Sequence, residues 1–146
     1  MNTLAKIIVL TLVVSVAAFL LAPVLWPPAP GTPTPQGAQL VFFILLAILS
    51  ALTFGAGVAF LAFGWPVVRY ATDIARVPAW PLFVALGWLL VSWWPHNNLH
   101  LSVGGDLSGV LAIEYAFHVS MYVAGLIVVW FFLAAMQHAS TPAVKP

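Results

Sequence analysis

The sequence predicts an all-α membrane protein, a bundle of four transmembrane helices. Three observations support this prediction: hydrophobic residues make up 64% of the chain, charged residues make up 5%, and four long apolar runs are separated by short polar or proline-rich segments. A soluble domain carries roughly 25% charged residues, so this chain could not cover its surface with hydrophilic groups. We therefore expect a single membrane domain, residues 1–146, with the lipid bilayer as its main solvent.

The first two spans are predicted at residues 4–26 and 39–65. A helix needs about 20 mostly apolar residues to cross the hydrocarbon core of a bilayer, and the first stretch contains a single charge, Lys6. The five prolines at residues 27–35 cannot continue a helix, so an extended, solvated loop is expected between the two spans. No convincing cleavage site precedes these prolines, so we expect the first helix to be retained rather than removed as a signal peptide.

The third and fourth spans are predicted at about residues 77–95 and 107–137. The most apolar part of the third, residues 80–94, would rise only about 22 Å as a helix, short of the roughly 30 Å hydrocarbon core. It could therefore begin earlier, near Thr72, continue past Pro95 with a kink, or cross only half of the bilayer. The fourth run is about 46 Å long, so it should tilt or project from the membrane at one end.

Four Trp-Pro pairs fall where the spans should begin or end, at residues 26–27, 65–66, 80–81 and 94–95. Tryptophan prefers the headgroup level of a bilayer, and proline is tolerated at helix ends. We interpret the pairs as interface anchors rather than as a cage for a ligand.

The basic residues predict the orientation of the chain. In a four-span arrangement all of them lie on one side of the membrane; they are Lys6, Arg69, Arg76 and Lys145. The loops predicted near residues 27–38 and 95–106 contain no Lys or Arg. The positive-inside rule then places both termini in the cytoplasm and residues 96–106 on the outer or periplasmic side, as in a protein of the bacterial inner membrane.

Two ridges of small residues, spaced by four, predict where helices pack. The second span contains Ala47, Ala51, Gly55 and Ala59, and the fourth contains Ala116, Ser120 and Ala124. Helices in lipid associate through close approach at small side chains, so both ridges should face protein. The sequence leaves open whether that protein is the same chain, a second copy or another membrane subunit.

Ligand-type side chains gather in one short part of the chain. Five of the seven His, Asp and Glu residues lie there; they are His96, His100, Asp106, Glu114 and His118. Glu114 and His118 are four residues apart and share a helix face, which Tyr122 continues. Gly104 and Gly105 allow the chain to fold back tightly.

Imidazoles and carboxylates are ligands that transition metals accept. We expect His100, Glu114 and His118 as the principal ligands, with Asp106 and His96 as further ligands. Copper or zinc is expected before iron, and haem is less favoured. The chain has no cysteine, so thiolate sites are excluded. The site could serve electron transfer, metal delivery or an oxidoreductase step, and whether the protein is an enzyme stays open.

Three other interpretations stay open. Glu114 and His118 could form only a structural pair, with Asp106 capping a helix and His96 in solvent. The chain could be a non-catalytic accessory or assembly subunit of a respiratory or photosynthetic membrane complex. A Glu–His pair could also relay protons in a proton or ion conductor. A net charge of +1 excludes a basic surface for nucleic acid.

Overall fold

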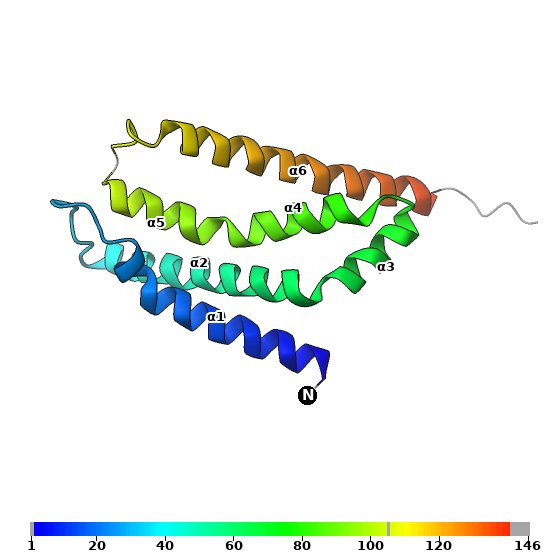
Figure 1. Ribbon diagram of the computed structural model, residues 1–146, viewed down its shortest axis with the longest axis horizontal. Helices are drawn as coiled ribbons and strands as arrows, with labels where there is room; N and C mark the ends of the chain where they lie inside the picture. The colour runs from blue at the N-terminus through cyan, green and yellow to red at the C-terminus, as the bar shows by residue number, and fades with distance from the viewer. Residues whose placement is uncertain (1, 105, 141–146) are drawn as a thin grey trace, which may run out of the picture.

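The computed structural model describes residues 2–104 and 106–140, and the regular structure within these ranges is entirely helical. The helices are α1 (Thr3–Leu25), α2 (Ala38–Phe63), α3 (Trp65–Ala75), α4 (Ala79–Val91), α5 (Trp93–Val103) and α6 (Leu111–Ser140) (Figure 1). Three of them, α1, α2 and α6, are long and apolar enough to cross a membrane. The prediction of an all-helical protein with membrane-type helices is confirmed to this extent.

The chain runs back and forth through side-by-side layers, in the order α1, α2, then α4 with α5, then α6 (Figure 1). The α1–α2 and α5–α6 connections lie at one end of the molecule. Both α3, which carries Arg69, and the start of α1, which carries Lys6, lie away from that end (Figure 1). Lys145, the last basic residue behind the predicted orientation, lies outside the described residues.

Helices α1 and α2 pack closely because small residues line their contact. A Cβ atom at Gly55 would collide with the Oγ of Ser15 and with the carbonyl of Thr11. The Ser15 hydroxyl donates a hydrogen bond to that carbonyl at 2.7 Å. Ala51 and Ala59 on the same ridge are buried, so the predicted packing ridge of the second span does face protein.

Helix α4 packs on the opposite side of α2, and this contact also depends on a glycine. A Cβ at Gly57 would lie 2.7 Å from the Val91 Cγ1 and 3.0 Å from its backbone nitrogen. Helix α4 in turn packs on α6, where Ala124 is buried. Ala116 is exposed within this chain, so the ridge predicted for the fourth span faces the rest of the chain only in part.

The third predicted span is divided into α4 and α5 by a bend at Ser92. Pro95 has no backbone N–H, so the carbonyl of Val91 loses its ordinary helical donor. The next helical hydrogen bond is present, because the N–H of His96 donates to the Ser92 carbonyl at 3.2 Å. The helical path therefore continues past Pro95 with a kink, over residues 79–103 and a rise of about 37 Å.

Two segments outside the predicted spans are helices. The polar link after the second span is α3, which ends at Arg76 in the left-handed conformation, with φ of 52°. The loop expected over residues 95–106 is helical as far as Val103. In contrast, the fourth helix begins at Leu111 rather than residue 107, because turns occupy residues 107–110.

One of the four Trp-Pro anchors is a core residue instead. Trp94 is only 8% exposed and packs with Ala18 and Ala51, and its ring centroid lies 5.0 Å from that of Phe54. Because the helix continues through Pro95, Trp94 does not stand at the end of a span. Trp80, by contrast, is 66% exposed, as an anchor requires.

Candidate metal centre

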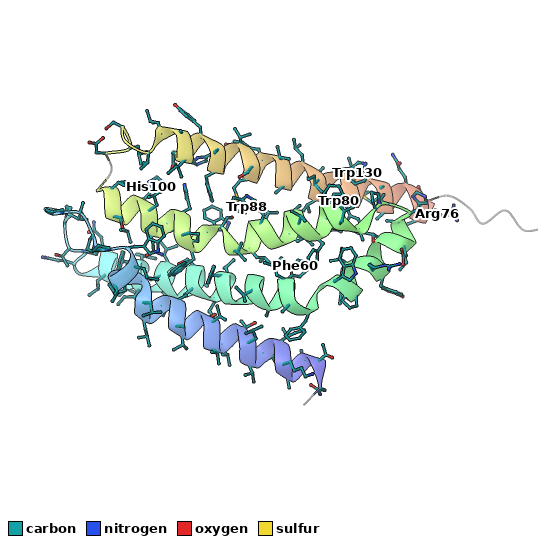
Figure 2. All side chains as sticks on the ribbon, in the orientation of Figure 1. Phe60, Arg76, Trp80, Trp88, His100 and Trp130 are labelled. Carbon is teal, nitrogen blue, oxygen red and sulfur yellow. The ribbon has the colours of Figure 1, made fainter. Side chains whose placement is uncertain are left out.

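The candidate site lies between α5 and α6, at the end of the molecule where the two connections meet. His96 and His100 are one helical turn apart on α5, so both imidazoles project from one face of that helix. Glu114 stands in the first turn of α6 and faces back toward them. Figure 2 shows His100 at this end of α5.

Three ligand atoms from these residues form an almost equilateral triangle. The Glu114 Oε1 lies 3.2 Å from the His96 Nε2 and 3.3 Å from the His100 Nε2. The two imidazole nitrogens are themselves 3.2 Å apart. His96, His100 and Glu114 thus form a group whose ligand atoms all lie close enough to hold one metal ion.

The edges of this triangle match the coordination sphere of a small transition-metal ion. Ligands bound tetrahedrally at about 2.0 Å are about 3.3 Å apart. The same distances lie within hydrogen-bond range, and one imidazole can donate to the Glu114 oxygen or to the other imidazole. One cation among the three atoms would instead use a lone pair from each.

Two of the three side chains in the group are buried, and they leave polar atoms without protein partners. The side chains of His96 and Glu114 are only 9% and 10% exposed. Among the described residues, the buried Glu114 Oε2 and His96 Nδ1 have no hydrogen-bond partner. Buried polar atoms without a hydrogen-bond partner are rare, and they are typical of sites that bind an ion or water.

His118, expected as a principal ligand, lies beside the triangle rather than in it. Its Nδ1 is 3.4 Å from the Glu114 Oε1 but donates to the Glu114 backbone carbonyl at 2.8 Å. Since a carbonyl only accepts, this bond fixes the proton on Nδ1 and leaves Nε2 as the available lone pair. The structure instead brings His96, expected only as a further ligand, into the centre.

Asp106, the other further ligand, does not approach the group. Its exposed carboxylate accepts a hydrogen bond from the backbone N–H of Ser108 at 3.1 Å, in the turn that precedes α6. Hydrogen bonds from the Ser108 side chain and backbone hold the pKa of the Asp106 carboxyl below its ordinary value. Asp106 therefore shapes the connection. Its neighbour Gly105 lies outside the described residues.

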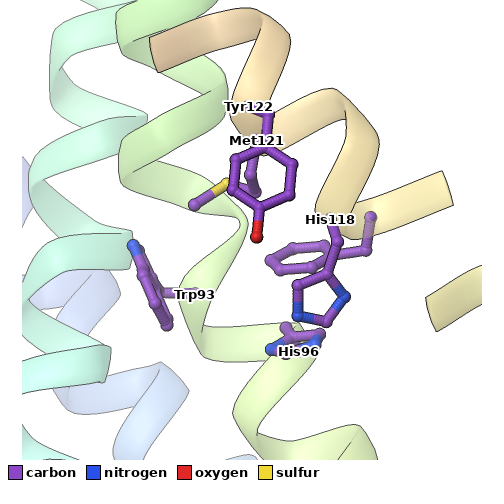
Figure 3. A pocket seen from close by; sticks show the side chains of 6 residues that line it. Trp93, His96, His118, Met121 and Tyr122 are labelled. Atoms are coloured by element: carbon purple, nitrogen blue, oxygen red, sulfur yellow. The ribbon is translucent and has the colours of Figure 1, made fainter. Parts of the chain in front are cut away.

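An open pocket of about 330 Å³ adjoins the triangle. It is lined by Trp93, His96, Phe117, His118, Met121 and Tyr122 (Figure 3). The His96 imidazole stacks on the Phe117 ring, with centroids 3.8 Å apart and planes 6° from parallel. The sequence placed Tyr122 on the face of Glu114 and His118, but Trp93, Phe117 and Met121 were absent from the predicted site. The signal for these three is helical spacing, three residues from His96, Glu114 and His118 respectively, which is common in any apolar helix.

Two imidazoles and one carboxylate are the protein ligands of some catalytic zinc sites and of non-haem iron sites. The geometry thus permits a transition-metal ion without choosing among the metals. Comparison with protein-family models, with curated proteins and with solved structures found no match for this chain.

Proposed function

We propose that the protein is an integral membrane protein that binds one divalent transition-metal ion through His96, His100 and Glu114. The triangle of ligand atoms, with edges of 3.2 to 3.3 Å, carries this proposal. Two imidazoles and one carboxylate are the protein ligands of some catalytic zinc sites, and imidazole also suits copper. Zinc is therefore the first candidate and copper the second.

Three protein ligands leave a tetrahedral ion with one open position. Structural zinc sites are closed by four protein ligands, whereas catalytic sites keep a position for water or substrate. His118 stands next to the triangle with its Nε2 lone pair available, and His100 is 38% exposed on the side chain. We therefore propose a reactive or metal-transferring site rather than a purely structural one.

The proposed membrane arrangement has four spans, in which α4 and α5 together make the third. The bent pair extends over residues 79–103, which is long enough to cross the hydrocarbon core of about 30 Å. Lys6 and Arg69 lie away from the metal-binding end, so the positive-inside rule supports placing that end on the outer side.

Metal analysis of the purified chain tests the proposal. We expect protein in lipid nanodiscs, equilibrated with zinc and dialysed, to retain one equivalent. His96→Ala and Glu114→Gln should lose it. His138→Ala is the matched control, because the His138 Nδ1 only donates to the Ala134 carbonyl at 2.9 Å on an exposed part of α6. Equal metal content in the control and in Glu114→Gln would refute the site.

A proton relay is a second candidate, because His100, His96, Glu114 and His118 are linked by contacts of 3.2 to 3.4 Å. The relay would have to continue across the bundle, yet between His118 and His138 the α6 sequence offers only Tyr122 as a titratable group. Proton flux in liposomes that Glu114→Gln abolishes, in protein without bound metal, would favour the relay over the metal site.

A further inference from the structure

Helix α3 differs from the long helices because it exposes charged and apolar side chains together. It has 11 residues and lies between the end of α2 and the start of α4, away from the metal-binding end (Figure 1). Its charged residues are Arg69 and Asp73, four residues apart, and Arg76 follows its last residue directly. All three are exposed. Two of the four basic residues of the chain are thus gathered at this short helix.

One face of α3 packs against the rest of the protein. Its residues are Val68, Thr72 and Ala75, which are spaced by four and three and are no more than 4% exposed. The helix contacts both α4 and α6. This attachment fixes the directions of the two remaining faces of α3 relative to the long helices.

A second face of α3 is apolar and open. Its residues are Val67, Tyr70 and Ile74, spaced by three and four, and they are 69%, 72% and 62% exposed. Such a face is unfavourable in water, and a bilayer would cover it. The charged residues, in turn, would be costly in the hydrocarbon core. A helix with both features suits the boundary between hydrocarbon and headgroups, with its axis along the surface.

Exposed tryptophans support the same level for the bilayer boundary. Trp65 begins α3, Trp80 stands in the first turn of α4, and Trp130 lies on α6, and all three are exposed. Figure 2 shows Trp80 and Trp130 in the half of the molecule that ends at Arg76. Tryptophan is enriched at the headgroup level, so lipid phosphates should lie near the charged residues of α3.

The two arginines are available to such phosphates. Among the described residues, neither Arg69 nor Arg76 forms an ion pair with a carboxylate, although Asp73 lies between them in the sequence. A guanidinium group donates two parallel hydrogen bonds to a phosphate, which favours arginine wherever phosphate is recognised. A zwitterionic headgroup balances its phosphate with its own cation. An anionic headgroup leaves that charge for the protein.

We propose that α3 is an interfacial helix that binds anionic phospholipids of the adjoining leaflet. The guanidinium groups of Arg69 and Arg76 hold headgroup phosphates, and the acyl chains cover the apolar face of the helix. This proposal rests on the membrane arrangement proposed above. It does not depend on the metal site, which lies at the other end of the molecule.

Competition between two lipids tests the proposal. Phosphatidylglycerol and phosphatidylcholine with the same acyl chains differ only in their headgroups. We expect native mass spectrometry of the detergent-solubilised chain, mixed with equal amounts of both, to show about a fivefold excess of the anionic lipid in the complex. This value follows from about fivefold per charge near a bilayer surface, with two arginines and one aspartate. Equal occupancy by the two lipids would overturn the proposal.

Variants of the exposed charges predict changes of opposite sign. Arg69→Gln or Arg76→Gln should abolish the preference, whereas Asp73→Asn should raise it about fivefold. Lys6→Gln is the matched control, because Lys6 is an exposed basic residue on α1 and should not affect the preference. The same loss in Lys6→Gln as in Arg69→Gln, or a weaker preference in Asp73→Asn, would contradict recognition by α3. Displacement of the lipid by an equal concentration of glycerol 3-phosphate would identify a site for a soluble phosphate and overturn the proposal.

A cysteine introduced into the cysteine-free chain separates this proposal from the membrane arrangement. In nanodiscs, the thiol of Asp73→Cys should react with a water-soluble maleimide, because that face of α3 is placed at the bilayer surface. A reactive thiol without a lipid preference in the unchanged chain refutes lipid binding alone. An unreactive thiol refutes the surface position of α3, and with it both the arrangement and this proposal.

Discussion

Helices α4 and α5 are two parts of one bent path, yet they attach to their neighbours in different ways. In α4, Gly87 accommodates Leu61 of α2, and Ala85 is 3% exposed, so the backbones approach closely. In α5, Trp94 packs on α2, but the link to α6 is made by His96 and His100 around the Glu114 carboxylate. The stacking of His96 on Phe117 adds to this link. The α2–α4 contact is thus made by close packing, and the α5–α6 contact mainly by polar side chains.

This difference shows how two helices can stay attached where their backbones do not pack closely. Lipid provides little hydrophobic drive for helices to associate, so cohesion comes from small residues or from polar contacts of about 0.6 kcal/mol each. Such contacts are individually weak. A metal ion bound to both α5 and α6 would add the free energy of its coordination to this link.

The largest expected effect is on metal affinity at the polar link. Glu114→Gln keeps the size of the side chain but removes the charge of the ligand, so zinc affinity should fall by more than about 100-fold. Equilibrium dialysis with a competing chelator measures this. A fall of less than tenfold would show that the carboxylate is not a ligand.

The stability of the close-packed α2–α4 contact should depend on side-chain volume instead. Gly57→Val would drive a side chain into Val91, including its backbone nitrogen, and should destabilise the fold by about 1–3 kcal/mol. Gly125→Val is the matched control, because nothing lies within 4 Å of a Cβ at Gly125. Thermal unfolding in detergent should separate the two variants, and equal melting temperatures would contradict the described α2–α4 packing.

His118→Ala should have a smaller effect on metal affinity than His100→Ala, because His118 is outside the group of residues whose ligand atoms all lie close enough to hold one ion. We expect about a tenfold loss of affinity for His118→Ala, as for a group that supports ligands without binding the ion. Losses of the same size in both variants would identify His118 as a ligand, as the sequence alone predicts.

Asp106→Asn should leave zinc affinity unchanged, because that side chain belongs to the turn before α6. A pH titration sharpens this prediction. Because Ser108 lowers the pKa of Asp106, the carboxylate stabilises the turn above its ordinary pKa, and this contribution is lost as pH falls through the lowered value. The amide introduced by Asp106→Asn does not titrate, so acid unfolding of the variant and of the unchanged protein should differ only slightly.

The three long helices could be predicted from the sequence because length and hydrophobicity decide them locally. The course of the helices in the third predicted span could not, since Pro95 is compatible both with a helix end and with a kink. Trp94 was misplaced for the same reason. Its burial against Phe54 depends on the helix continuing through Pro95.

The crowding of ligand-type residues correctly marked where the candidate group would be found. Which histidines meet Glu114 is decided across two helices, by the path of the connection between them and by the bend at Ser92. Spacing of four favoured His118, which shares a helix with Glu114. The structure brings His100 to the carboxylate, as expected, but places His96 there instead of His118, and such inter-helix register leaves no local pattern in the sequence.

The proline-rich connection between α1 and α2 also affects the end of the molecule that carries His100. The N–H of Ala29 donates to the carbonyl of Leu101 at 3.3 Å, one residue beyond His100, and a side chain at Gly104 would touch Ala29. The connection is thus strapped across the last turn of α5. Because the same turn carries His100, a change in the path of this connection should also change the position of that imidazole.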